Sequence, residues 1–276
     1  MGWHATLGLH YAHGAHGTTL RFTHQGPMRV FKPLYPEGQD ICQTVWVHPP
    51  GGLVQGDSLA LDVSVAPHAH AVLSTPGATR FYGNNSGALA QQHVHCQVHE
   101  HARLEWLPLE TIVYPGCLGM NTWHATLAPS AEVLAMETTH LGLPGANEAF
   151  AQGRWQQRQQ IDSVWLDEGT VDATDLALLD GPAGLAGRRH WGTLMLARGS
   201  AWPEAQRDAL LELARACLGA HPHVTAGVSA VHPQVLLLRA LAHQGQHLAP
   251  LLREVWGQWR GHAWQLPALA PRTWAM

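Results

Sequence analysis

The stretch Leu59-Ala60-Leu61-Asp62-Val63-Ser64-Val65 indicates the fold most directly. Its large aliphatic residues occupy every second position, and Asp62 and Ser64 stand between them. Successive side chains of a strand point to opposite faces, so this alternation predicts a strand with one buried and one solvated face.

Similar short extended segments recur throughout residues 1–200, separated by Gly and Pro and without long helical patterns between them. The clearest of them are Ala71–Ser74, Gln92–Val98, Arg103–Leu107 and Thr122–Leu127. Strands at this spacing are typical of a mainly β protein built from packed sheets.

The pattern changes after residue 200. Pro203 and Gly219 bracket an expected helix over Glu204–Leu218, and a β-hairpin is expected around Val224–Val228 and Val235–Leu241. A second helix is expected from about His247 to Arg260. Its apolar stripe, which predicts a face turned to the core or to a partner, consists of Leu248, Leu251, Leu252, Val255, Trp256 and Trp259. We therefore expect one domain over residues 1–276, β-rich over 1–200 and with two helices in its C-terminal quarter.

The composition points to a protein that binds other proteins. Charged residues make up 13% of the 276 residues, against about 25% in an ordinary soluble domain, and 12 residues are Trp. Such a composition suggests a charge-poor, Trp-rich exterior suited to large interfaces. A net charge of −4 argues against nucleic acid as a partner.

No segment predicts a membrane helix, and no secretory signal is recognised, so no membrane association is expected. The four cysteines are widely separated and form no C-x-x-C pair, which favours a reducing, cytoplasmic location. Phosphate-binding P-loops, H-E-x-x-H motifs and G-x-S-x-G motifs are all missing from the sequence. The common enzyme signatures therefore fail, and we expect a protein that is not an enzyme.

The segment from His93 to His101 could bind a metal. If it is extended throughout, His93, His95, His99 and His101 share one face, and imidazoles bind Ni²⁺, Cu²⁺ or Zn²⁺. A metal-dependent hydrolase or a His-rich nickel buffer would both use this face. The alternative is that these histidines only fill solvent-facing positions in a chain with 21 His.

Five carboxylates stand alone in apolar or Gly/Pro-rich surroundings: Asp57, Glu105, Glu110, Glu137 and Glu148. A buried carboxylate must be paired, hydrogen-bonded or hydrated, because burying it bare is too unfavourable. Unpaired acids along a hydrated channel would attract a divalent cation without trapping it. Ordinary salt bridges and turn caps remain an alternative for all five.

Several long motifs resemble one family. In chain order they are GPMRVFKPLYPE (26–37), HPPGGLVQGD (48–57), TPGATRFY (75–82), LEWLPLETI (104–112), GLPGANEAF (142–150) and PRTW (271–274). They resemble the urease accessory protein UreD family, called UreH in some organisms, through nearly the whole chain. Gln55, Met136 and Leu143 depart from the family pattern, where Gly, Trp and Arg are usual.

The resemblance implies a non-enzymatic scaffold of urease maturation. Such proteins bind apo-urease subunits and, through UreF, the nickel-carrying GTPase UreG, and they assist nickel delivery to the carbamylated-lysine dinickel site. No tightly bound cofactor is implied, only transient Ni²⁺. The implied fold is mostly β, with sheets arranged helically and two helices near the C-terminal end.

Two site hypotheses follow from this resemblance. Asp57, with Glu105, Glu110, Glu137 and Glu148 as further candidates, would line or support a nickel route. The C-terminal helices, with Leu252, Trp256 and Trp259, would form or buttress the UreF-binding surface.

Overall fold

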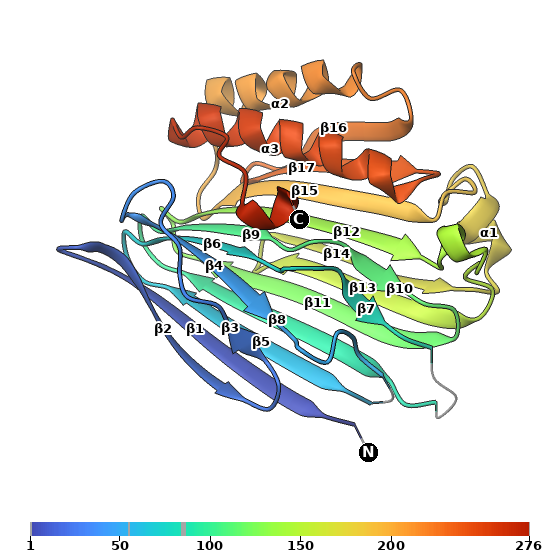
Figure 1. The fold of residues 1–276 in the computed structure, drawn as a ribbon. Helices are drawn as coiled ribbons and strands as arrows, with labels where there is room; N and C mark the ends of the chain where they lie inside the picture. Colours follow the sequence, from blue (N-terminus) through green and yellow to red (C-terminus); the bar gives the residue numbers. More distant parts are fainter. Residues whose placement is uncertain (1, 55, 84–86, 276) are drawn as a thin grey trace.

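The structure is a computed structural model that describes residues 2–54, 56–83 and 87–275 (Figure 1). Two β-sheets pack face to face, and a layer of helices covers the outer face of one of them. The seven-stranded sheet has the order β14 (Trp165–Asp172), β13 (Gly153–Ile161), β11 (Cys117–Leu127), β8 (Ala90–Val98), β5 (Ser58–Val65), β1 (His4–Gly14) and β2 (Gly17–Gln25).

The second sheet has ten strands. Its main path is β16 (Val224–His232), β17 (Val235–Ala242), β15 (His190–Arg198), β12 (Glu132–Leu141), β9 (Arg103–Leu107), β6 (His70–Ser74), β4 (Ile41–Val47) and β3 (Arg29–Val30). Beside this path, β10 (Thr111–Val113) pairs with β12 and with β7 (Thr79–Phe81).

The chain winds between the two sheets. From β4 to β13 it passes repeatedly from one sheet to the other, and neighbouring strands along β5, β8, β11 and β13, and along β4, β6, β9 and β12, are parallel. Antiparallel strands end the winding: β2 beside β1, β14 beside β13, and the β15, β17, β16 meander. The expected mainly β fold with helically arranged sheets is confirmed.

The alternating stretch Leu59–Val65 lies in β5, an interior strand of the seven-stranded sheet. Leu59, Leu61, Val63 and Val65 are each at most 2% exposed and belong to the core between the sheets. Asp62 points to the outer, solvent-facing side. The alternation therefore identified both the strand and its buried face.

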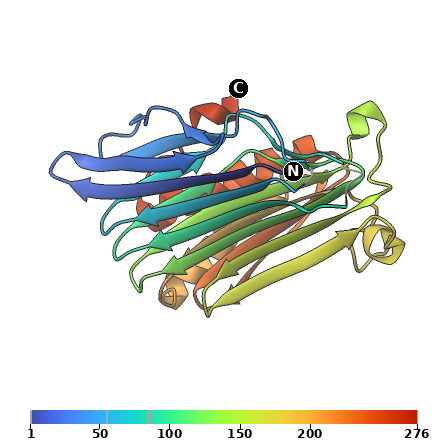
Figure 2. The same cartoon turned by 90° about the horizontal axis from the view of Figure 1, so that it is seen from below.

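The two long helices are α2 (Glu204–Leu218) and α3 (Leu248–Trp264), as expected from the sequence apart from a longer end of α3. They pack on the outer face of the ten-stranded sheet and form a second core with it (Figures 1 and 2). The shorter helices are α1 (Leu176–Asp180), η1 (Pro144–Ala146), η2 (Gly245–His247) and η3 (Arg272–Ala275). No helix in the described ranges is both long and apolar enough to cross a bilayer.

The expected Trp-rich exterior is wrong. Of the 12 tryptophans only Trp3 is largely exposed, at 57%. Large aromatic side chains fill the space between layers, where each buries much apolar surface. The low charge of the sequence therefore reflects two cores in a three-layer molecule as much as its exterior.

Candidate functional site

Glu137 occupies the centre of the molecule. It lies on the β12 face turned toward the seven-stranded sheet and is 7% exposed. Its carboxylate accepts hydrogen bonds from Trp106 Nε1 at 3.2 Å, Gln157 Nε2 at 3.2 Å and Gln159 Nε2 at 2.8 Å. All three donors are neutral, and within the described residues no Lys, Arg or His forms an ion pair with Glu137. Burial raises the pKa of Glu137 against the opposing effect of these hydrogen bonds.

A row of polar side chains extends from Glu137 in both directions between the sheets. On one side Asn121 interacts with Glu137 and accepts a hydrogen bond from Gln92 Nε2 at 3.1 Å. On the other side Gln157 Oε1 accepts from Trp191 Nε1 at 3.1 Å, and Gln159 pairs with Thr193 at 3.3 Å. We call these residues the polar row: Gln92, Asn121, Glu137, Gln157, Gln159, Trp191 and Thr193.

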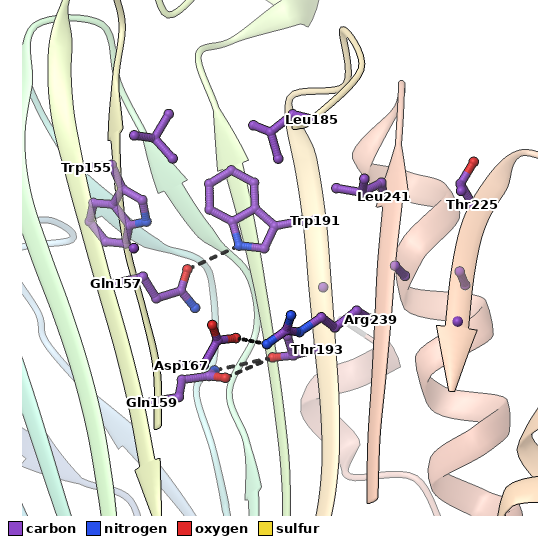
Figure 3. Close-up of a pocket in the computed structure, with 16 residues that line it drawn as sticks. Trp155, Gln157, Gln159, Asp167, Leu185, Trp191, Thr193, Thr225, Arg239 and Leu241 are labelled. Carbon is purple, nitrogen blue, oxygen red and sulfur yellow. Dashed lines mark hydrogen bonds and ion pairs between the residues drawn. The ribbon is translucent and has the colours of Figure 1, made fainter. Parts of the chain in front are cut away.

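Each end of the polar row opens into a cavity. The larger cavity, of about 550 Å³, lies between β13–β14 of one sheet and β15–β17 of the other, and Gln157, Gln159 and Thr193 are among the residues that line it (Figure 3). The smaller cavity, of about 250 Å³, is lined by Gln92 and by the loops over 47–53 and 75–80. The polar row therefore connects two cavities through the core between the sheets.

The larger cavity has apolar walls and a charged rim. Trp155, Trp191 and Leu185 contribute apolar surface near one end (Figure 3). Across its rim, Arg239 of β17 donates to Asp167 Oδ2 of β14 at 2.6 Å, which joins the two sheets. With the Trp191–Gln157 and Thr193–Gln159 bonds, this ion pair crosses the gap between β13–β14 and β15–β17.

Asp57 holds a loop. Its Oδ1 accepts from the backbone N–H of Trp3 at 2.8 Å, and its Oδ2 accepts from the N–H of Val54 at 2.9 Å. It is 7% exposed and lies outside both cavity linings, but it fixes the turn after Leu53, which lines the smaller cavity. The departure at Gln55 lies outside the described residues.

Glu105 lies on the opposite face of the ten-stranded sheet from Glu137, against the helices. Its carboxylate accepts from His70 Nε2 at 2.9 Å, Trp256 Nε1 at 2.9 Å and Arg260 Nε at 3.0 Å, and it is fully buried. Burial alone would raise the pKa of Glu105, but the hydrogen bonds and charges of His70 and Arg260 together lower it. Its acceptor sites are occupied by donors that tie α3 to the sheet.

The other two candidate carboxylates lie apart from the polar row. Glu110 is half-buried in the loop between β9 and β10 and interacts electrostatically with Arg253 of α3. Glu148 is exposed and borders a surface cavity of about 480 Å³ beside Tyr82 and Tyr114. The five carboxylates predicted from the sequence are therefore not brought together.

The three helix residues assigned to partner binding are buried within this chain. Leu252 and Trp259 are 0% exposed and Trp256 is 2% exposed. Trp259 Nε1 donates to Leu210 O of α2 at 2.9 Å, and Trp256 donates to Glu105. The hypothesis that they contact a partner directly is wrong, because the apolar stripe of α3 packs on its own sheet. That they buttress a partner surface stays a prediction.

The expectation that four histidines share one face of an extended strand is also wrong. Strand β8 ends at Val98, and the chain then turns, with His101 at φ 58°. His93 and His95 share the outer face of the sheet, but His99 and His101 belong to the turn, and the His101 ring stacks on His68. In the described part of the chain no group of three or more His, Cys, Asp or Glu side chains is placed to hold a metal ion. The structure thus offers no ligand set for a metal-dependent hydrolase on this face.

Sequence reasoning missed most of the polar row. A signal was present in β13, Gly153-Arg154-Trp155-Gln156-Gln157-Arg158-Gln159-Gln160-Ile161, where Gln157 and Gln159 are in phase with Trp155 and Ile161. Amides on the apolar face of a strand must find buried partners. Read in this way, the strand would have predicted a polar path inside the core.

Comparison with known proteins agrees with the family resemblance of the sequence motifs between residues 26 and 274. The family model described as "UreD urease accessory protein" matches residues 4–275. The chain is 46% identical to a protein named urease accessory protein UreD from Paracidovorax citrulli and 47% identical to one from Verminephrobacter eiseniae, over the full length of both chains in each pair. It is 46% identical to the UreD of Albidiferax ferrireducens, again over the full length of both. The chain belongs to the UreD family of urease accessory proteins.

Proposed function

We propose that this protein is a non-catalytic scaffold that binds apo-urease and, through UreF, the GTPase UreG in the cytoplasm. Full-length family membership supports a role in urease maturation. The sequence has no P-loop, so nucleotide hydrolysis would come from a partner.

We further propose that Ni²⁺, the cargo of this assembly, passes between the two sheets along the polar row. The observation that supports this is Glu137, a buried carboxylate held by neutral donors inside the polar row, whose outer members line two cavities. A carboxylate without a cationic partner attracts a divalent cation, and oxygen ligands release nickel more readily than a closed set of His and Cys. Asp57 supports this route indirectly, by fixing the loop beside the smaller cavity.

Glu105, Glu110 and Glu148 have weaker claims to this role. Glu105 already has three donors, including the guanidinium of Arg260, so a metal ion would have to displace them. Glu110 and Glu148 lie away from the row. We therefore place the route at Glu137 and assign Glu105 to stability.

The test uses cells that carry the complete urease operon. With this gene deleted, we expect inactive, nickel-poor urease. With the wild-type gene, we expect co-purification of the product with UreF and apo-urease, and active enzyme. Full activation without the gene would overturn the scaffold proposal.

The route is tested separately by Glu137→Gln, with Glu168→Gln on the exposed strand β14 as the matched control. We expect Glu137→Gln to keep co-purification with both partners but to lower the nickel content of urease at limiting Ni²⁺. Unchanged nickel content at every Ni²⁺ concentration would overturn the route and leave the scaffold proposal intact.

The apolar stripe of α3 packs inside this chain and cannot meet a partner. We therefore propose the opposite, exposed side of α2 and α3 as the UreF surface. Gln258→Arg changes an exposed position of α3, and Thr170→Arg changes an exposed position of β14 as a control. We expect only Gln258→Arg to reduce capture of UreF. Equal capture by both variants would place the UreF surface elsewhere.

A further inference from the structure

The outer face of the seven-stranded sheet carries a row of two histidines between two aspartates. Asp62 of β5 is directly opposite His95 of β8, and His95 is directly opposite His124 of β11. Asp162 follows β13 and completes the row beside His124. Neighbouring strands lie about 4.8 Å apart, so side chains opposite each other on one face are adjacent.

Each histidine has a carboxylate near one of its ring nitrogens. His124 Nε2 lies 2.6 Å from Asp162 Oδ1, and Asp162 Oδ2 accepts a hydrogen bond from Thr126 at 2.7 Å. His95 Nδ1 lies 3.7 Å from Asp62 Oδ1. The bonds from Thr126 and His124 lower the pKa of Asp162, which keeps this carboxylate charged.

The other nitrogen of each ring is free. Across the described residues, His124 Nδ1 and His95 Nε2 have no hydrogen-bond partner, and the ring centroids are 5.1 Å apart. The side chains are 34% and 49% exposed, so water and ions reach them. A histidine that binds a metal through one nitrogen usually donates its other N–H to a carboxylate, a backbone carbonyl or water, and His124 is placed to donate to Asp162.

His93 is two residues from His95 on the same face and differs in one respect. Both of its nitrogens are engaged: Nδ1 with Thr122 Oγ1 at 2.8 Å and Nε2 with Gln91 Oε1 at 3.1 Å. It therefore lacks a free lone pair. The contrast selects the cross-strand pair His95 and His124 rather than the sequence-adjacent pair His93 and His95.

We propose that His95 and His124 together bind one exchangeable divalent transition-metal ion of the Ni²⁺, Cu²⁺ and Zn²⁺ class, with water completing its coordination. Imidazole suits these ions, and two protein ligands make a site that releases its ion readily. Asp162 is a positioning residue that holds the His124 ring. The site lies on the solvent side of the seven-stranded sheet, whereas the polar row lies on its inner side, so the two are independent.

The test measures Ni²⁺ and Zn²⁺ binding to the untagged full-length chain by equilibrium dialysis. We expect His95→Gln and His124→Gln each to lose the same one equivalent of metal, and the double variant to lose no more than either. The control His93→Gln should retain that equivalent. We expect Asp162→Asn to retain the equivalent with several-fold weaker affinity.

A second measurement does not depend on variants. Ni²⁺ is paramagnetic, so less than one equivalent of it broadens the NMR signals of nearby histidine rings in ¹H–¹³C correlation spectra. We expect the His95 and His124 signals to broaden together and before that of His93. Equal metal stoichiometry in His95→Gln, His124→Gln and wild type, or broadening of His93 first, would overturn the proposal.

Discussion

Burial of Glu137 changes the pKa of its carboxyl group, and with it the pH dependence of stability. Its pKa is raised by burial, so the folded protein holds this proton more tightly than the unfolded chain does. Stability from this group is therefore greatest below the ordinary pKa of about 4.5 and falls as pH rises toward the folded pKa. We expect Glu137→Gln to weaken the fall in the free energy of unfolding as pH rises above about 4.5, measured by urea denaturation. Identical slopes for Glu137→Gln and wild type would contradict this account.

His140 and His190 behave in the opposite sense. Their ring centroids lie 4.8 Å apart. Burial lowers the pKa of each imidazole from 6.5 to about 4, and the charges of His140 and His243 lower the pKa of His190 further. As pH falls, these two histidines are protonated in the unfolded chain before they are protonated in the folded protein. The free energy of unfolding therefore decreases as pH falls from 6.5 through about 4. We expect His190→Gln to lose less stability than wild type between pH 7 and 5, measured by thermal unfolding. The exposed control His16→Gln should follow wild type.

Helix α3 depends on two buried ion pairs that share Arg260. Arg260 is 1% exposed and contacts both Glu105, at 3.0 Å, and Glu37, at 2.7 Å. Removing one partner of a buried pair leaves an uncompensated charge, which typically lowers stability by about 3–5 kcal/mol. We expect a loss of this size for Arg260→Met in urea denaturation. Arg207→Met on α2, whose partners Glu204 and Asp208 are exposed, should lower stability by at most about 1 kcal/mol.

The elements themselves were largely predictable. β5, β9, α2 and the β16–β17 hairpin appear where alternation, helical periodicity and the Pro203 and Gly219 signals place them. Helix α1 was not predicted, because five residues capped by Asp175 are too few to show a helical period. The expected extended segment Gln92–Val98 lies in β8, but the further extension to His101 is wrong, because the alternation in the sequence continues through a turn that only the backbone reveals.

The site was less predictable than the fold. Glu137 and Glu105 looked alike in sequence, yet they occupy opposite faces of one sheet, and only Glu105 has cationic partners. The row Asp62, His95, His124 and Asp162 needs the register of parallel strands, which a single sequence does not contain. The buried stripe of α3 was correctly identified, but periodicity alone did not distinguish a core from a partner.

The larger cavity is an opening between the two sheets with room for larger side chains on its walls. Gly169 and Gly227 line it, and an added Cβ at either meets no atom within 4 Å. We expect Gly169→Trp and Gly227→Trp to fill the cavity with little change in thermal stability, and to reduce urease activation several-fold while partners still co-purify. Gly14→Trp, at another open position, is the control. Normal activation with a filled cavity would exclude it as part of the nickel route.

The winding of the chain also determines when the polar row can form during synthesis. Its members come from β8, β11, β12, β13 and β15, and Gln92 precedes Thr193 by about a hundred residues of chain, so its contacts are long-range. A nascent chain released from the ribosome as far as β12 carries Glu137 without Gln157 and Gln159. The interior of this protein is therefore completed late, and until β15 emerges the growing chain carries the amides of β13 and the apolar inner face of the seven-stranded sheet without their native partners.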